Sequence, residues 1–145
     1  MEKKELLEIT RATRTAAVQA VFAACFRGEK PGPALLRRFA SGQYLDAGEG
    51  VRPDQALLAY LAKGVVAKKE ELDAVIQPLL SAPIAKNDPL LVSILRAGAF
   101  EIMFREQTPK RVAVAEYTRL AADFLPAQKV ALVNAVLDRI GEPAK

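Results

Sequence analysis

The chain has 145 residues and a formal net charge of +4, and 51% of its residues are hydrophobic. This length and composition predict a single folded domain over residues 1–145. It contains no histidine and one cysteine, Cys25, which excludes histidine-dependent catalytic triads, histidine-ligated metal sites and an intramolecular disulfide. No apolar run reaches the roughly 18–20 residues that span a membrane. The first residues lack a signal-peptide pattern, and we expect a cytoplasmic protein.

The hydrophobic residues of the N-terminal third repeat with a helical period. This period predicts a first helix that is capped by Thr10 and ends at Gly28 in a left-handed conformation. Residues 1–9 are expected to form a flexible extension before it. A short second helix is expected over residues 34–40, and a long loop over residues 41–52 follows from three glycines without a sustained period.

Prolines mark most of the later helix boundaries. Pro53 suits the first position of a third helix, and Pro78 is expected to kink or end the fourth. Asp88 followed by proline predicts the start of a fifth helix that runs to Phe104. Because this helix is apolar nearly all round, it is expected to be the central one, covered on every side.

Two further helices complete the prediction. Thr108 and the proline after it predict the start of a sixth helix that ends near Phe124. Pro126 opens a seventh, which ends at Gly141. No segment alternates with period two. We therefore predict an all-α fold, a bundle of about seven helices.

The positive charge is concentrated at the N-terminal end. Residues 1–38 hold eight basic and four acidic residues, which accounts for the whole net charge of +4. Arg11 and Arg14 are three positions apart and share one helical face. At the start of a helix the dipole disfavours cations, whereas arginine binds phosphate oxygens well. The pattern favours an anionic partner such as RNA, and a solvated basic face is the alternative.

Without histidine, catalysis would depend on carboxylate, lysine, tyrosine or serine side chains, and those in the sequence form no recognisable catalytic motif. No phosphate-binding glycine loop is present either, and we expect no enzymatic activity, no cofactor and no metal site. Arg96 and Glu101 interrupt the apolar fifth helix, where a charge requires a partner. They mark a functional site, a structural ion pair or an exposed edge of the helix. Glu116 is a candidate partner for Arg96.

Several motifs of this sequence occur together in one known family. Residues 94–102 (I-L-R-A-G-A-F-E-I) and residues 108–116 (T-P-K-R-V-A-V-A-E) resemble the L-R-x-A-x-Y-E-L helix and the V-P-x-K-V-A-I-N-E signature of the NusB family of transcription antitermination factors. Residues 132–138 (L-V-N-A-V-L-D), which include Asn134, are similar to F-V-N-G-V-L-D. Residues 14–22 (R-T-A-A-V-Q-A-V-F) match the A-R-x-x-A-V-Q-A-L-Y opening. The order and nearly the spacing of the family are kept.

The resemblance implies seven helices in two subdomains and a role in transcription. The family pairs with ribosomal protein NusE, and the pair binds the boxA element of nascent single-stranded RNA within an antitermination complex with RNA polymerase. Arg11 and Arg14 match the segment where the family places much of its RNA contact. Arg96, Glu101, Glu116 and Asn134 match motif positions and are expected to have structural or partner-binding roles. Some members self-associate and others do not, so monomer and homodimer both stay open.

The last helix departs from the family pattern. Ala131 and Leu132 stand where the family has lysine and phenylalanine, and Ala135 replaces a glycine. Lys129 is expected to supply RNA-binding charge there, although it matches no family lysine. Two alternatives follow: a divergent helical adaptor that binds proteins without boxA recognition, and the NusB-like domain of a ribosomal RNA cytosine methyltransferase.

Overall fold

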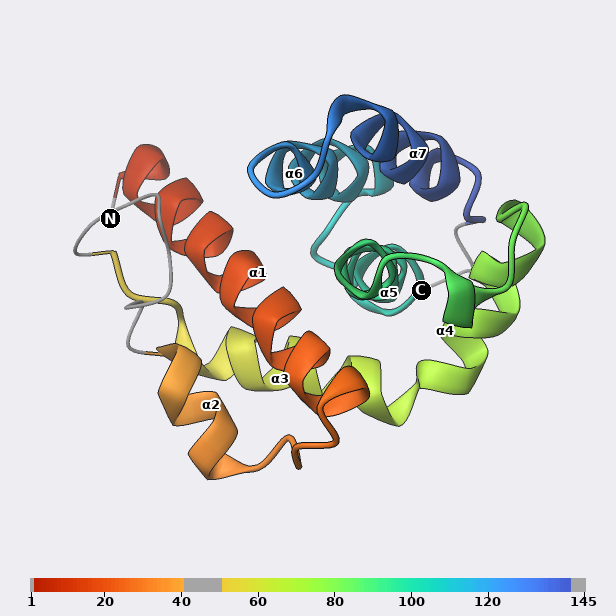
Figure 1. The fold of residues 1–145 in the computed structure, drawn as a ribbon. Helices are drawn as coiled ribbons and strands as arrows, with labels where there is room; N and C mark the ends of the chain where they lie inside the picture. Colours follow the sequence, from red (N-terminus) through yellow and green to blue (C-terminus); the bar gives the residue numbers. More distant parts are fainter. Residues whose placement is uncertain (1, 41–50, 142–145) are drawn as a thin grey trace. The chain divides into compact units, whose positions relative to one another are not determined.

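A computed structural model describes residues 2–40 and 51–141, and these residues form seven α-helices, two short 3₁₀ helices and no strand (Figure 1). The chain divides into two compact units, residues 1–66 and residues 67–145. The all-α prediction, the helix count and the division into two subdomains are confirmed. The predicted loop over residues 41–52 lies mostly outside the described residues.

The first unit contains three helices: α1 (Lys3–Phe26), α2 (Pro33–Ala40) and α3 (Gln55–Ala67), whose last residue reaches the second unit. Apolar side chains from all three helices are buried, including Val18, Val21, Leu35, Leu61 and Val65. The hydroxyl of Thr13 also ties α1 to α3, because it accepts a hydrogen bond of 2.8 Å from the backbone N–H of Asp54.

The start of the first helix was predicted wrongly. Thr10 is not a cap: it lies inside α1, which begins at Lys3, and its hydroxyl donates to the carbonyl of Leu6. A threonine that satisfies its hydroxyl four residues back fits a helix interior, so the capping signal was ambiguous. The flexible extension over residues 1–9 stays a prediction, and the structure places residues 3–9 within α1. At the other end, Gly28 has the predicted left-handed φ of 70°.

The second unit contains α4 (Lys69–Ile76), η1 (Gln77–Leu79), η2 (Ile84–Lys86), α5 (Pro89–Phe104), α6 (Lys110–Ala122) and α7 (Ala127–Asp138). Helix α5 packs against α4, α6 and α7 (Figure 1), and every residue from Leu91 to Ile102 is buried. The predicted central helix is thus confirmed. Pro78 lies in η1, directly after α4 ends at Ile76, as the proline pattern predicts.

The helix boundaries of both units can be compared with the boundaries predicted from the sequence. Asp88 caps α5 as predicted, because its carboxylate accepts from the N–H of Leu90 at 2.8 Å. The predicted start of α6 is wrong by one residue, because the N-cap position is Pro109, and the hydroxyl of Thr108 donates to Glu101 at 2.7 Å. Pro53 and Pro126 both precede their helices rather than opening them, and Asp54 caps α3 through the N–H of Leu57.

Gly98 permits a close approach between helices of the second unit. A Cβ atom at this position would lie 2.8 Å from the Cδ1 atom of Leu137 on α7 and 3.3 Å from the Tyr117 ring on α6. Both distances are shorter than ordinary van der Waals contacts. The absence of a side chain at residue 98 therefore sets how closely α5 packs against its two neighbours.

Candidate nucleic-acid interface

The N-terminal half of α1 presents two arginines in different environments. Residues 2–8 are exposed, and they include Lys3 and Lys4. Arg11 is half-buried, whereas Arg14 is only 4% exposed. The sequence contained a signal for this difference: Arg14 precedes Val18 and Val21 by four and seven positions, which places it on their inner stripe. Of the two predicted RNA contacts, Arg11 has the accessible surface.

Lys129, the predicted RNA-binding residue of α7, lies in an ion pair. Its Nζ atom is 2.8 Å from the Oδ2 atom of Asp88, the residue that caps α5. The hydrogen bond from Lys129 lowers the pKa of the Asp88 carboxyl, burial opposes this effect, and the N–H of Leu90 adds to it. The pair therefore joins the start of α7 to the start of α5. An RNA contact by Lys129 stays a prediction.

This ion pair predicts a dependence of stability on pH. Because the pKa of Asp88 is lower in the folded state, its contribution is present above the ordinary aspartate value of 3.8 and is lost as the pH falls below it. Asp88→Asn keeps the cap and removes the charge, and both side chains are partly exposed, so we expect a loss of about 0.5–1 kcal/mol at neutral pH. Urea denaturation between neutral and acidic pH measures it. If the difference in unfolding free energy between the variant and wild type grows toward low pH, the Asp88 carboxylate does not stabilise the fold through this ion pair.

Arg96 is held by an acidic residue that the sequence analysis did not select. Its Nε and Nη2 atoms lie 2.8 and 2.9 Å from the two carboxylate oxygens of Asp73 on α4. The arginine side chain is 4% exposed and the aspartate side chain 27% exposed. Glu116, the predicted partner, is half-buried on α6. The bidentate geometry identifies a structural ion pair between α4 and α5.

Glu101 is the acceptor at the centre of a buried polar cluster. Tyr117 and Thr108 donate to its two carboxylate oxygens at 2.6 and 2.7 Å, and Arg105 lies 3.7 Å away. Glu101 itself is 0% exposed, so the expected exposed edge of the helix is wrong for this residue. The cluster joins α5 to α6 and to the turn between them. Glu101 is thus the acceptor through which these elements are connected.

The remaining motif residues lie at the surface of the second unit. Asn134 is exposed on α7, and its side chain donates to the hydroxyl of Thr118 on α6 at 3.3 Å. Ala131 and Ala135 are exposed on the same helix, and Leu132 is half-buried. Because Ala135 is exposed, the methyl group that it has in place of the family glycine does not press against a neighbouring helix.

No group of described side chains offers a metal site: three or more His, Cys, Asp or Glu residues do not converge anywhere within residues 2–40 and 51–141. Nor does any helix in the described ranges combine the length and apolar character needed to cross a membrane. What these ranges do contain is a set of buried ion pairs and an exposed start of α1, where Lys3 and Lys4 lie among three glutamates and Arg11 follows half-buried. The fold and these groups define a small helical protein of two units whose buried charges serve its structure.

Comparisons with known proteins identify the family. A profile described as the NusB family matches residues 11–142. Transcription antitermination protein NusB of Rhodospirillum rubrum is 42% identical over 95 residues, which span 64% of this chain and 51% of that protein. The NusB of Rhodopseudomonas palustris (strain TIE-1) is 35% identical over 137 residues, 89% of this chain and 76% of the relative. The chain belongs to the NusB family.

A solved structure agrees in fold. A crystal structure of antitermination factors NusB and NusE in complex with dsRNA contains a chain that superposes with a TM-score of 0.74 at 21% identity, covering 96% of this chain and 97% of that one. At this identity the likeness establishes the fold. The curated relatives are named as antitermination proteins, a class without catalytic activity, which confirms the non-enzymatic prediction.

Proposed function

We propose that this chain pairs with ribosomal protein NusE in the cytoplasm and that the pair binds the boxA element of nascent, mainly ribosomal, RNA. The bound pair supports antitermination by RNA polymerase. The observation that carries this proposal is the family match over residues 11–142. The solved complex of a NusB with NusE and RNA supports both partners.

The charge of the chain is consistent with a shared RNA surface. A net charge of +4 is modest, and its whole excess lies in residues 1–38. RNA binding through so few cations is weak and strongly dependent on salt. A second basic protein that extends the surface raises the affinity through linked binding. We therefore expect weak binding by the chain alone and tight binding by the heterodimer.

Fluorescence anisotropy of a labelled boxA RNA tests the proposal. The chain, its cognate NusE and their mixture are titrated at two salt concentrations, with a scrambled RNA as the control. We expect the mixture to bind boxA about tenfold or more tightly than either protein alone, and to discriminate against the scrambled RNA. A mixture that binds both RNAs equally would refute boxA recognition.

The two α1 arginines are expected to respond differently to substitution. Arg11→Ala removes an accessible cation, so it should reduce the slope of log affinity against log salt by about 0.7 and leave the melting temperature unchanged. Arg14→Ala empties a buried position, so it should destabilise the protein by about 2 kcal/mol. Thermal unfolding and RNA titration of both variants separate these effects. If Arg14→Ala loses as much RNA affinity as Arg11→Ala while its stability is unchanged, Arg14 contacts the RNA directly.

A specific observation favours a second candidate, an adaptor that binds proteins without boxA recognition. Helix α7 has Ala131 and Leu132 where the family has lysine and phenylalanine, and Lys129 is engaged by Asp88. In this case the chain binds NusE, and the mixture binds boxA no more tightly than scrambled RNA. Restoring the family residues with Ala131→Lys and Leu132→Phe should then recover discrimination.

A further inference from the structure

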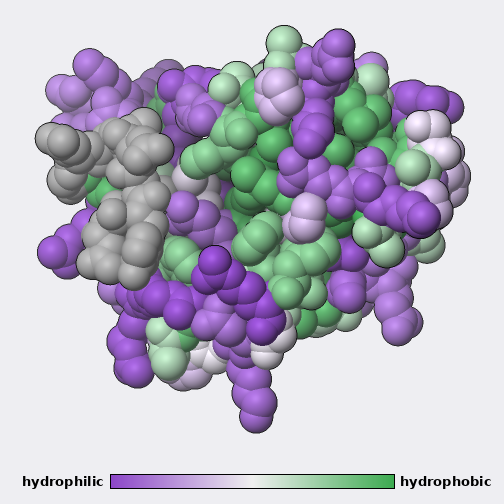
Figure 2. Space-filling model, in the orientation of Figure 1, coloured by the Kyte–Doolittle hydropathy of each residue, from purple (hydrophilic) through white to green (hydrophobic). Residues whose placement is uncertain are grey.

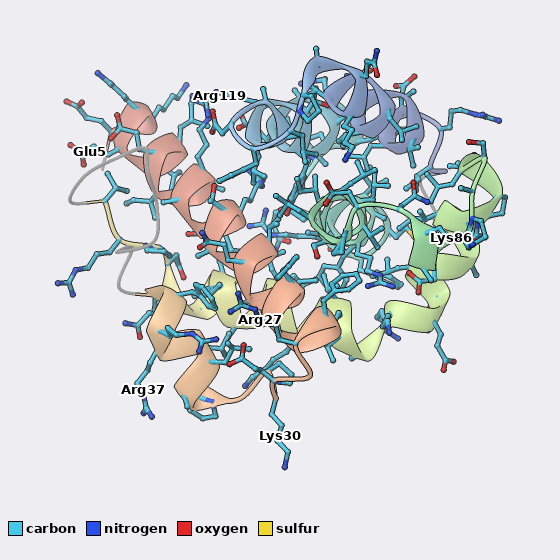
Figure 3. The ribbon with its side chains drawn as sticks, viewed as in Figure 1. Glu5, Arg27, Lys30, Arg37, Lys86 and Arg119 are labelled. Carbon is cyan, nitrogen blue, oxygen red and sulfur yellow. The ribbon has the colours of Figure 1, made fainter. Side chains whose placement is uncertain are left out.

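A second basic surface lies at the opposite end of α1 from Arg11. Residues 27–38 contain four basic residues and one acidic residue, a net charge of +3. The acidic residue, Glu29, is already neutralised, because both of its carboxylate oxygens accept from Arg38 at 2.9 and 3.0 Å. Arg27, Lys30 and Arg37 are exposed and form no ion pair with the described residues. Figure 3 shows Lys30 and Arg37 extending outward from the ribbon.

Aromatic rings accompany these cations. Phe26, the last residue of α1, is 39% exposed, and its ring centroid lies 5.6 Å from that of Phe22. The guanidinium of Arg27 lies over the Phe22 ring at 5.9 Å, and that of Arg38 over the Phe39 ring at 5.0 Å. We name Phe26, Arg27, Lys30 and Arg37 the α1–α2 surface. Hydrophilic side chains cover much of this end of the first unit in Figure 2.

Folding alone explains only part of this arrangement. Cations near helix C-termini are favoured by the helix dipole, which accounts for Arg27 after α1 and Arg37 in the last turn of α2. The dipole does not account for Lys30, which lies between the helices, or for the exposure of the Phe26 ring. None of the three cations has an acidic partner among the described residues to offset its charge. A polyanion with unstacked bases would match both the charge and the ring.

We propose that the α1–α2 surface binds single-stranded RNA that flanks the boxA element, through its phosphates and one stacked base. This inference rests on the proposed function. Exposed aromatic rings among cations are the usual platform for single-stranded nucleic acid, because bases stack on the rings and cations contact the backbone. Bases in an A-form duplex are paired and stacked, so they are not available to Phe26. Binding of this kind does not depend on RNA sequence.

The test compares a boxA RNA with the same RNA extended by about 12 uridines on either side, a length within the range that such surfaces cover. Each RNA is titrated with the chain together with NusE between about 50 and 200 mM salt. We expect the extension to raise the affinity of the wild-type pair about tenfold. The variant Arg27→Gln, Lys30→Gln and Arg37→Gln should lose this gain, with a salt slope lower by about 2, because three phosphate contacts are removed.

A charge-matched control lies in the second unit. Lys86→Gln, Arg119→Gln and Arg139→Gln remove three exposed cations as well, and two of the positions are close equivalents. Arg139 is the C-cap of α7 as Arg27 is of α1, and Arg119 lies in the last turn of α6 as Arg37 does in α2. The control variant should keep the gain from the extension. If both variants lose it equally, net charge is responsible and the α1–α2 surface is not a binding site.

Phe26→Leu tests the stacked base, because leucine keeps the apolar contact with Phe22 and removes the ring face. We expect it to lower the affinity for the extended RNA about tenfold and to leave the affinity for the short RNA unchanged. Melting temperatures exclude unfolding as the cause.

The outcomes separate this inference from the proposed function. If the wild-type pair does not bind boxA at all, the proposed function fails. If it binds the short RNA and gains nothing from the extension, the proposed function stands and the α1–α2 surface does not bind RNA. If the triple variant instead loses NusE, the surface is a protein interface, which also overturns the inference.

Discussion

Glu101→Leu is expected to destabilise the protein by about 3 kcal/mol. The substitution leaves the hydroxyls of Tyr117 and Thr108 without their acceptor, and both residues are at most 1% exposed. Each buried donor without a partner costs about 1–3 kcal/mol. Removing a buried charge recovers part of this loss. Urea denaturation should show a lower midpoint at an unchanged m-value.

Two variants control this result. Glu106→Leu changes an exposed glutamate five positions along the chain and should alter stability by less than about 0.5 kcal/mol. The double variant of Glu101→Leu with Tyr117→Phe removes one orphaned hydroxyl together with its acceptor, so it should be less destabilised than the sum of the single variants. Additive effects would show that the tyrosine and the glutamate are not coupled.

Asp73→Asn is expected to cost about 3 kcal/mol, and more than removal of the arginine that it binds. It removes the carboxylate that accepts two hydrogen bonds from the buried guanidinium of Arg96. Breaking a buried pair in this way typically costs about 3–5 kcal/mol, and the 27% exposure of Asp73 admits some water that reduces the penalty. Arg96→Met removes the buried charge itself and should be milder. The two variants are compared by chemical denaturation.

The order of these two stabilities is the decisive result. Glu70→Gln, an exposed change on the same helix α4, serves as the control and should have little effect. Combining Asp73→Asn with Arg96→Met should cost no more than Asp73→Asn alone, because the unpaired charge is gone. A protein in which Arg96→Met is the more damaging change would show that packing, not charge, dominates at this position.

The fold was predictable where local chemistry decides it. The apolar circumference of α5 predicts its central position, and Asp88 with Pro89 predicts its start. The proline after α4 and the left-handed glycine after α1 act through one or two backbone angles, so the sequence shows them directly. The cap predicted at Thr10 was wrong because a threonine hydroxyl can also donate to the carbonyl four residues back inside a helix.

The partners of charged residues were harder to predict. The need for a partner at Arg96 is visible in the sequence, but the identity of Asp73, which is 23 positions away, depends on how α4 packs against α5. In the same way Lys129 and Asp88 are 41 positions apart. The burial of Arg14 was accessible from its spacing to Val18 and Val21. The basic charge excess instead favoured an RNA contact for this residue.

Helix α1 fixes the distance between the two proposed RNA contacts. Arg11 and Phe26 lie on one uninterrupted helix, 15 residues apart, which places them about 22 Å apart along its axis and about 60° apart around it. At about 3.4 Å per stacked nucleotide, roughly six nucleotides bridge this distance. A shorter spacer between the two bound segments must unstack and stretch to reach both, and a much longer one lowers their effective concentration. The affinity for a transcript would therefore depend on the number of nucleotides between its two bound segments.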